Sequence, residues 1–443
     1  MNYREAVRYL LSFADFERSG RFQDRPDVSP MLLLLHELGD PHLGRRTVHV
    51  AGSKGKGSIS AMVESILREA GYWTGLYTSP HLHSYRERVR INGDPLSPDG
   101  FVRLTSSVKR GVAHARPKLG ERSFVTFDLL TALGFMAFRE AGVQIQVVEV
   151  GLGGRLDSTN VFEEKDLAVI TPISLEHTQI LGDTIEAVAR EKCGIVTPGC
   201  TVIMAPQQHE DAERVIRAAA AAEAAELIDV SRDYEWRMTK HDLKRQEIRV
   251  QHEGEPVLAR LPLLGANQVE NAATAVACVN ALRRRGAHIP EESIRDGLAC
   301  VRWPGRAEVL TETPLLIVDG AHNRDSARRF RETLAEYFSA ERAFFIVGAS
   351  VDKDIVGLAE ELAPVAQNVF AVRADHPRAM EPARIAEAFA ALGVPAEVRD
   401  SVGAAIDEAM ADNSGGGVIC VVGSLFVAAA AREHLGRAER EPI

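Results

Sequence analysis

The sequence predicts an α/β protein of two domains, each built on a mainly parallel sheet. Three observations support this. Apolar runs rich in β-branched residues alternate with helical patterns over most of the 443 residues, as βαβ units require. A glycine-rich turn joins one strand to a helix early in the chain. A second series of strands and helices begins near residue 300, so we expect a larger domain over residues 1–300 and a smaller, Rossmann-like domain over residues 301–443.

The alternation in the first domain begins at residue 47. Short apolar runs predict four strands, at residues 47–51, 145–150, 167–171 and 201–205. Helical spacing of apolar residues predicts helices at residues 58–70, 127–140 and 184–192, with an alanine-rich helix inside residues 209–225. This order of elements is typical of a parallel sheet covered by helices.

The second series follows an Arg-Trp-Pro-Gly-Arg segment at residues 302–306, whose turn chemistry marks the expected domain boundary. Strands are predicted at residues 315–318, 343–347, 369–372 and 418–422. Helices are predicted at residues 325–337, 355–365, 382–392 and 401–410. No repeat of solenoid period interrupts the pattern.

The composition argues against several classes of protein. The formal net charge is -10, whereas a binder of duplex nucleic acid needs a basic face. No stretch reaches the roughly 18 apolar residues of a membrane span, and the charged first 20 residues are unlike a signal peptide. Five widely spaced cysteines without a Cys-x-x-Cys pair favour a reducing compartment. We therefore expect a cytoplasmic protein that binds neither nucleic acid nor membranes.

The strongest local motif is a phosphate loop. The first strand runs into Gly-Ser-Lys-Gly-Lys-Gly-Ser at residues 52–58, and helical spacing follows. Glycines let the backbone wrap an anion, the helix N-terminus adds positive potential, and Lys56 reaches the β- and γ-phosphates. The spacing departs from G-x-x-x-x-G-K-[ST], because Val50 stands at the first glycine position and Gly57 separates Lys56 from Ser58. The alternative is a glycine-rich turn that binds nothing.

A carboxylate lies at the end of the strand predicted at residues 145–150. Ligands bind at the carboxyl ends of parallel strands, and Glu149 stands there, followed by a glycine-rich turn. Such an oxygen ligand suits magnesium, although a purely structural hydrogen-bond acceptor is the alternative. The guanine-reading Asn-Lys-x-Asp motif does not occur, so a regulatory GTPase is not expected.

Longer motifs follow one another along the chain. They lie at residues 52–58, 77–82, 87–93, 149–160, 176–178, 190–195, 303–306, 319–323 and 423–425. In this order they strongly resemble the folylpolyglutamate synthases and dihydrofolate synthases of the Mur ligase superfamily, over residues 45 to 428. The runs at 149–160 and 319–323 are much more specific than the phosphate loop alone.

The resemblance implies an ATP-dependent ligase and roles for particular residues. Those expected to contact ATP are Gly52, Gly55, Lys56, Gly57, Ser58, Asn271, Arg306 and Asp319. Those expected to hold Mg²⁺, with two ions expected, are Ser79, Glu149, His177 and, if it is carbamylated, Lys192. Those expected to act in catalysis are Lys56, Lys192 and His322. Those expected to contact the pterin side of the substrate are Val125, Thr126, Phe127, Asp128, Leu156, Asp157 and Ser158.

Ordinary structural roles stay open for several of these side chains. His177 could be a core or loop histidine, since magnesium prefers oxygen ligands. Lys192 could pair with a carboxylate on a helix face, and its carbamylation would need a depressed pKa. His81 and His83, in a loop, could be solvated or could touch substrate. Cys193 is expected to be a buried filler, because no activating base is identifiable.

Four residues depart from the family pattern. Lys54 stands where Asn is usual, Asp128 where Glu is usual, Glu176 where Asp precedes the metal histidine, and Asn267 where His precedes Gln268. None removes an expected phosphate or metal ligand, so the departures bear on the pterin substrate more than on the chemistry.

The expected chemistry needs these residue types. Amide formation requires an activated acyl group, which ATP supplies as an acyl phosphate that the amine of L-glutamate attacks. Both steps accumulate negative charge, so Lys56, magnesium and Arg306 would carry the stabilisation. A site closed between two domains excludes water. We expect a monomer that joins L-glutamate to dihydropteroate or to a reduced folate, with the choice between these steps left open by the sequence.

Two other functions are compatible with parts of the sequence. Another amino-acid ligase of the Mur superfamily, such as one of cell-wall precursor synthesis, would share the chemistry, but the segments at 79–93 and 151–160 favour the folate branch. A nucleotide-binding protein without catalysis is the other alternative. Four residues that catalysis would need argue against it, namely Lys56, Glu149, His177 and Lys192.

Overall fold

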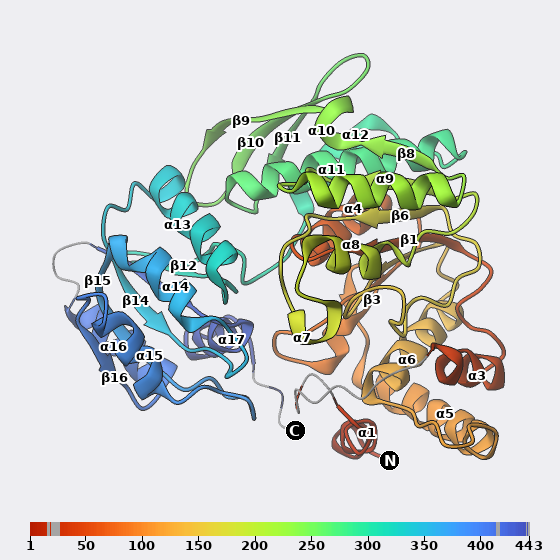
Figure 1. Ribbon diagram of the computed structural model, residues 1–443, viewed down its shortest axis with the longest axis horizontal. Coiled ribbons are helices and arrows are strands. Elements are labelled where there is room, and N and C mark those ends of the chain that lie inside the picture. The colour runs from red at the N-terminus through yellow and green to blue at the C-terminus, as the bar shows by residue number, and fades with distance from the viewer. Residues whose placement is uncertain (16–17, 19–26, 413–416, 440, 442–443) are drawn as a thin grey trace.

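The protein forms two α/β units that lie side by side (Figure 1). The structure is a computed structural model that describes residues 1–15, 18, 27–412, 417–439 and 441. Mainly parallel sheets organise both units, so the predicted fold class is confirmed. In the part of the chain that is described, no helix combines the length and the apolar character that a membrane crossing requires.

The first unit is built on an eight-stranded sheet. Its strands are β1 (Arg46–Ala51), β2 (Thr74–Tyr77), β3 (Val89–Ile91), β4 (Asp94–Pro95), β5 (Ile145–Glu149), β6 (Leu167–Ile170), β7 (Thr201–Met204) and β8 (Glu226–Asp229). Their order is β4-β3-β2-β5-β1-β6-β7-β8, parallel from β2 to β8 and antiparallel at β3 and β4. The four strands predicted for this region agree with β1, β5, β6 and β7 within one residue.

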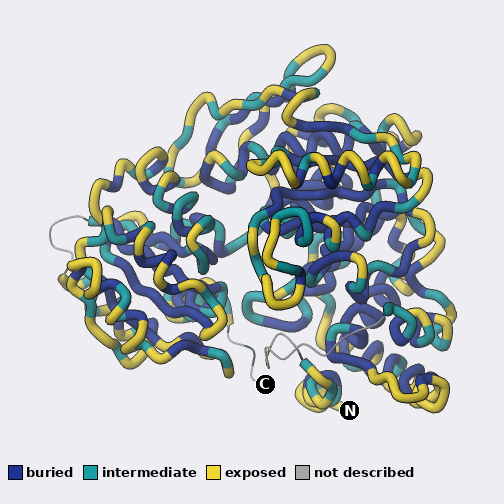
Figure 2. The backbone as a smooth tube through the Cα atoms, in the orientation of Figure 1, coloured by how far each residue is buried: buried dark blue, intermediate teal, exposed yellow. Residues whose placement is uncertain are grey.

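Helices cover both faces of this sheet. One face packs against α4 (Lys56–Glu69), α11 (Ala266–Arg284) and α12 (Glu291–Cys300). On the other face, α6 (Thr126–Glu140) packs on β2 and β3, and α1 (Tyr3–Leu10), α3 (Ser29–Glu37) and α5 (Pro98–Ala115) form a further layer with α6. On the same face, α8 (Ile185–Cys193) and α9 (Glu210–Ala222) cover β6 and β7. The central strands are accordingly buried while outer helix surfaces are exposed (Figure 2). The short segments η1 (Tyr85–Arg88), η2 (Arg116–Lys118), α7 (Thr178–Leu181) and α10 (Val230–Asp233) complete the unit.

A small antiparallel sheet that the sequence analysis did not predict lies beyond α11. Its strands are β9 (Glu235–His241), β10 (Gln246–Gln251) and β11 (Val257–Leu261). Buried and exposed residues alternate along β10 and β11, the period-2 pattern of a sheet with one covered face. That alternation was the signal available in the sequence.

The second unit is built on a six-stranded sheet whose first strand begins at residue 308. Its strands are β12 (Glu308–Glu312), β13 (Leu315–Val318), β14 (Ala343–Val347), β15 (Ala366–Ala371), β16 (Ala396–Val398) and β17 (Val418–Val422), in the order β12-β13-β17-β14-β15-β16. Its helices are α13 (Arg324–Phe338), α14 (Ile355–Leu362), α15 (Pro382–Ala390), α16 (Val402–Asp412) and α17 (Leu425–His434). The predicted helix at 355–365 ends earlier as an α-helix, because Pro364 lies in the 3-10 turn η3 (Ala363–Val365).

The strand order brings the chemically important loops together. β1 lies between β5 and β6, and Val50 of β1 is in register with Glu149 of β5. The chain connects β1 through α4 to β2, on one side of β1, and connects β5 to β6, on the other side. A crevice opens where such connections run to opposite sides, at the carboxyl ends of the strands. The phosphate loop and Glu149 therefore lie at the same edge of the sheet.

Tight packing of α12 on α4 leads to a prediction about stability. A Cβ at Gly297 would lie 2.4 Å from the Cα and 2.6 Å from the backbone nitrogen of Ile66, so Gly297→Ala must push the two helices apart. Overpacking of this kind costs about 1–3 kcal/mol, more than the ~1 kcal/mol that alanine gains over glycine in a helix. Thermal unfolding should show a lower Tm for G297A. Exposed Asp296 on the same helix supplies the control, D296A, which should keep the wild-type Tm. An unchanged or higher Tm for G297A would contradict the packing.

Candidate active site

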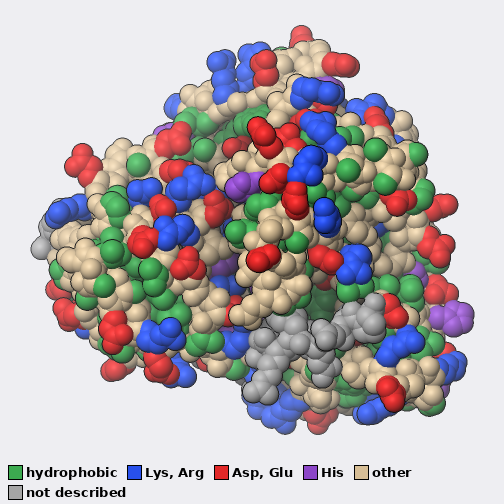
Figure 3. All heavy atoms as spheres, in the orientation of Figure 1, with side chains coloured by type: hydrophobic (Ala, Val, Ile, Leu, Met, Phe, Trp, Pro, Cys, Tyr) green, Lys and Arg blue, Asp and Glu red, His purple; other side chains and the backbone are tan. Residues whose placement is uncertain are grey.

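A cavity of about 1990 Å³ lies where the two units face each other. Its wall includes the phosphate loop and the loops after β5 and β6 from the first unit, and the loops after β13, β14, β15 and β17 from the second. The space-filling view shows the surface hollowed between the two halves, with histidine side chains in the hollow (Figure 3). The cavity is thus built from the carboxyl ends of both parallel sheets, where ligands bind in such folds.

The conformation of the phosphate loop requires its glycines. Gly52 has φ +147°, and a Cβ there would lie 1.9 Å from the hydroxyl oxygen of Thr171. Gly55, the N-cap of α4, has φ +82°, and a Cβ there would lie 2.6 Å from Oδ1 of Asn271. The amides of Ser53 and Lys54 both donate to the carbonyl of Pro172, at 3.0 and 3.1 Å. The loop is held against the edge of the sheet, with the N-terminus of α4 directed to the cavity.

Two lysines converge on the loop from different sides. Nζ of Lys56 donates to the carbonyl oxygen of Gly52 at 2.9 Å, and Nζ of Lys192 donates to the same oxygen at 2.8 Å. Lys192 also donates to Glu176 at 2.8 Å and is 1% exposed. Lys56 lines the cavity, whereas Lys192 lies behind the loop and is not part of the cavity wall.

Burial and neighbouring charges have opposite effects on the pKa values of the ionisable groups around the loop. Burial alone would raise the pKa of Glu176, but the nearby Lys192, Lys56 and Lys54 hold it below its usual range. Burial lowers the pKa of Lys192, an effect that Glu176 opposes. Burial likewise lowers the pKa of Lys54, which lines the cavity, to about 8. Glu176 is therefore ionised at neutral pH and held in place by lysines.

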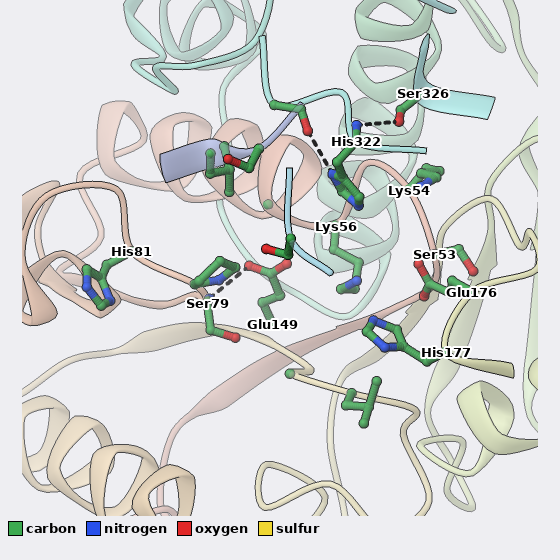
Figure 4. A pocket seen from close by; sticks show the side chains of 18 of the residues that line it. Ser53, Lys54, Lys56, Ser79, His81, Glu149, Glu176, His177, His322 and Ser326 are labelled. Carbon is green, nitrogen blue, oxygen red and sulfur yellow. Dashed lines mark hydrogen bonds between the residues drawn. The ribbon is translucent and has the colours of Figure 1, made fainter. Parts of the chain in front are cut away.

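Glu149 is a buried carboxylate with few partners. It is 5% exposed and, among the residues that the structure describes, accepts one hydrogen bond, from the backbone nitrogen of Ser79 at 3.3 Å. Burial raises its pKa to about 7, although Lys56 acts in the opposite direction. Figure 4 shows Lys56 pointing between Glu149 and His177, with Ser79 beside Glu149. Because buried polar groups are normally satisfied, this carboxylate is suited to receive a cation.

The expected magnesium ligands fit a hydrated ion. His177 has φ +48° at the start of α7, and burial lowers its pKa to about 4, so its ring is neutral. Within the described residues, no group of three or more His, Cys, Asp and Glu side chains could hold a metal. Magnesium, however, keeps several waters and often binds one or two carboxylates. The hydroxyl of Ser79, the carboxylate of Glu149 and the imidazole of His177 are compatible with such an ion.

The second unit contributes three expected residues to the opposite wall. Asp319 is half-buried and accepts from the amides of Ala307 and Ala321, at 2.8 and 2.7 Å. Arg306 lies beside it, and its charge opposes the rise that burial causes in the pKa of Asp319. Nδ1 of His322 lies 2.7 Å from the carbonyl of Gly320, so Nδ1 is the donor and Nε2 is left as an acceptor. Burial lowers the pKa of His322 to about 3, so the ring is neutral.

The residues expected on the pterin side separate into two groups. Val125, Thr126, Phe127, Leu156, Asp157 and Ser158 all line the cavity. Asp128 lies behind the wall and is fully buried. It accepts from the amide of Val125 at 3.0 Å and from the hydroxyl of Ser158 at 2.7 Å. Asp128 therefore connects the start of α6 to the loop that carries Ser158.

Several cavity residues were not identified from the sequence. Lys353 and Arg378 line the second unit's side, at 3.4 and 2.8 Å from the carboxylate of Asp352. They follow β14 and β15, so polar residues after predicted strands were the available signal. His81 and His83 are half-buried, line the cavity and have side-chain partners. His81 accepts from Arg88 at 3.0 Å, and His83 bonds to Glu433 and Arg432 of α17 at 2.9 and 3.2 Å.

Trp303 and Cys193 have packing roles, as expected for Cys193. Trp303 packs on the phosphate loop, since a Cβ at Gly57 would lie 2.6 Å from its ring, and Arg90 lies over that ring at 5.8 Å. Burial raises the pKa of the Cys193 thiol to about 12, so it is not a reactive nucleophile.

The raised pKa of Glu149 leads to a second prediction. Without divalent cations, Glu149→Gln should unfold at a higher temperature than the wild type at pH 8. Above the pKa of about 7 that Glu149 has in the folded protein, its buried charge lowers the stability by the full amount. This loss of stability becomes smaller as the pH falls from 7 toward 4.5, the ordinary pKa of a glutamate. The advantage of the variant should therefore be smaller at pH 5. Magnesium should raise the wild-type Tm at pH 8 and leave that of E149Q unchanged. Equal effects of magnesium on both proteins would exclude Glu149 as a ligand.

Comparison with known proteins places the chain in a family. The Mur ligase middle domain matches residues 106–279, and the Mur ligase glutamate ligase domain matches residues 305–425. A Lacticaseibacillus casei folylpolyglutamate synthase is 31% identical, with 98% of this chain and 99% of that protein covered. A solved Mycobacterium tuberculosis folylpolyglutamate synthase complexed with ADP and AMPPCP is 30% identical, with a TM-score of 0.88 over 99% of this chain and 100% of that one.

A longer relative also matches. A Haloferax volcanii protein described as a probable bifunctional folylpolyglutamate synthase/dihydropteroate synthase is 37% identical over 99% of this chain. The chain spans about half of that relative, 51% of its length. These matches cover both units and the residues that meet in the cavity. The chain therefore belongs to the folylpolyglutamate synthase and dihydrofolate synthase family of Mur ligases.

Proposed function

We propose that this protein is an ATP-dependent ligase that joins L-glutamate to the carboxylate of a folate-type acid through an acyl phosphate. One observation carries the proposal. A phosphate loop and a buried, poorly satisfied carboxylate face the Arg306, Asp319 and His322 of the second unit across a single cavity. Family membership supports the same reaction, and the haloarchaeal relative supports a place in folate metabolism.

The nucleotide would bind with its phosphates on the loop. Lys56 and the N-terminus of α4 supply the positive potential, and Lys54 adds a second lysine on the same wall. Gly52, Gly55, Gly57 and Ser58 shape the loop, and Asn271 packs against it. Arg306 and Asp319 would contact the nucleotide from the second unit. A similar solved structure is complexed with ADP and AMPPCP, which supports nucleotide binding by this fold.

Ser79, Glu149 and His177 would hold magnesium beside the phosphates. Bound there, the ion would neutralise charge on the transferred phosphoryl group. A second ion would require the carbamate of Lys192. Burial favours the neutral amine that carbamylation needs, but the new carboxylate would lie against Glu176, which now accepts from Lys192 at 2.8 Å. Two adjacent carboxylates repel each other unless a cation neutralises them. Carbamylation of Lys192 and binding of the second ion would therefore depend on each other.

The two substrates would enter from different walls. Phe127, Leu130 and Leu156 give the first unit's wall an apolar surface, next to the polar groups of Asp157 and Ser158, as a pterin ring with polar edges would require. Lys353 and Arg378 of the second unit provide cations for the carboxylates of L-glutamate. Nε2 of the neutral His322 is an acceptor suited to an amine hydrogen.

We further propose that the domains are residues 1–300 and 301–443. α12 ends at Cys300, and every strand of the six-stranded sheet lies after residue 307.

We also propose a monomer in a reducing, cytoplasmic compartment. All five cysteines are free, which supports that compartment.

The function is tested by glutamate-dependent release of ADP from Mg-ATP, with dihydropteroate and tetrahydrofolate offered in separate reactions. Release with one acid, together with a product heavier by one glutamate, would identify the step that the enzyme performs. Release with both acids would assign both steps. No release with either acid would refute the proposed substrate class.

The phosphate loop leads to a third prediction. Lys56→Ala removes a cation next to the transferred phosphoryl group, so ligation should fall by roughly 100-fold or more. The turnover number of the ligation assay is the measurement. Lys240→Ala, at an exposed lysine of β9, is the matched control and should keep wild-type turnover. Near-normal turnover of K56A would mean that this loop is not the catalytic phosphate site.

A further inference from the structure

Lys165 is a buried lysine that none of the roles above uses. It stands in the turn before β6 and is 5% exposed. Its Nζ lies 2.7 Å from the carbonyl of Ile195, 3.1 Å from Nδ1 of His49 and 3.5 Å from Oδ1 of Asn160. It also lies 5.7 Å from the ring centre of Phe162. The three hydrogens of one ammonium are thus directed to three separate segments of the chain.

This ammonium is held by neutral groups. In the part of the chain that the structure describes, no carboxylate forms an ion pair with Lys165, and burial lowers its pKa to about 7. Burying a cation without an acidic partner costs free energy that an apolar side chain of similar length would avoid. Packing alone therefore does not account for a lysine here. What the lysine adds is three donors of fixed direction.

The contact with His49 fixes the hydrogens of a chain of hydrogen bonds. Burial holds the pKa of His49 well below its usual range, so the ring is neutral. Nδ1 accepts from Lys165 and the ring hydrogen lies on Nε2, which donates to the hydroxyl of Thr159 at 2.9 Å, because this tautomer of the neutral ring leaves the hydrogen of that hydroxyl for Asp157. That hydroxyl then donates its own hydrogen to Oδ1 of Asp157 at 2.5 Å.

Asp157 is where this chain of hydrogen bonds reaches the cavity. Asp157 belongs to the cavity wall. Oδ1 also accepts from the amide of Thr159, and Oδ2 accepts from the amide of Leu152, both at 2.9 Å. One carboxylate thus holds both ends of the loop, and Asn160 ties the same loop to the carbonyl of Gly194 at 2.9 Å. The orientation of Asp157 decides the shape of this wall.

The phosphate loop does not depend on these contacts. β1, which carries His49, is hydrogen-bonded on both sides, to β5 and β6. Its backbone is fixed by the sheet, so a change in the His49 side chain should leave the loop after β1 in place. The chain of hydrogen bonds acts on one wall of the cavity.

We propose that Lys165 is a positioning residue for the acid substrate, because it fixes the tautomer of His49 and, through Thr159, the orientation of Asp157. The inference rests on the proposed function in one respect, namely that the wall around Asp157 contacts the acid. Without the ammonium, His49 can carry its hydrogen on Nδ1. The hydroxyl of Thr159 would then turn toward Nε2 of His49 and leave Asp157.

A double-mutant cycle tests this. Lys165→Met and Thr159→Val should each weaken binding of the folate-type acid by about tenfold, and the double variant should bind it no more weakly than T159V alone, because both changes break one chain of hydrogen bonds. The Kd of ADP should change by less than about twofold in all three variants. Calorimetric titration gives both constants. Lys240→Met, on β9, is the matched control and should show wild-type values.

Additive losses in the cycle would overturn the proposal, because Lys165 would then act by another route. Parallel losses of acid and ADP binding would also overturn it, since they indicate general loosening. Hydrogen exchange of the substrate-free protein keeps this test separate from the proposed function. K165M should speed exchange at residues 151–160, including the Leu152 amide, and leave β13 unchanged. Unchanged exchange at residues 151–160 would refute the positioning role, even if no folate-type acid binds.

Discussion

The carbonyl oxygen of Gly52 receives two lysine ammonium groups, from Lys56 at 2.9 Å and from Lys192 at 2.8 Å. This concentration of positive charge is the feature on which the rest of the site depends. It holds Glu176 ionised despite its burial, and it lies at the N-terminus of α4, where the helix adds potential of the same sign. A polyanion such as the phosphate chain of ATP is its natural complement. The low-dielectric walls of the cavity strengthen that attraction.

The fold places the opposing groups around this charge. Because β1 lies between β5 and β6, Glu149 and the phosphate loop share one edge of the first sheet. The second unit brings Arg306, Asp319 and His322 to the other side of the cavity. A reaction that passes through an acyl phosphate needs both walls, because the intermediate must be held by cations and kept from water.

Strong local patterns in the sequence predicted much of this structure. The predicted strands at 315–318, 343–347 and 418–422 agree with β13, β14 and β17, since short buried strands read as continuous apolar runs. Motifs of the phosphate-loop type predicted residues that the structure does bring to one cavity. Contacts between distant segments were beyond such patterns. No local sequence pattern predicts that Lys192 lies behind Gly52 or that Asp128 supports Ser158. Lys165 belongs to none of the motifs. The alternating strands β10 and β11 were a detectable pattern that was missed.

The central claim is that this cavity transfers a phosphoryl group from ATP to a carboxylate. The most direct measurement uses an acid substrate whose reacting carboxylate carries ¹⁸O, with L-glutamate and Mg-ATP. If an acyl phosphate forms, the attack of the amine leaves one labelled oxygen in the inorganic phosphate, and ADP is the nucleotide product. Ligation that releases only unlabelled phosphate, or that places the label in AMP, would contradict the account.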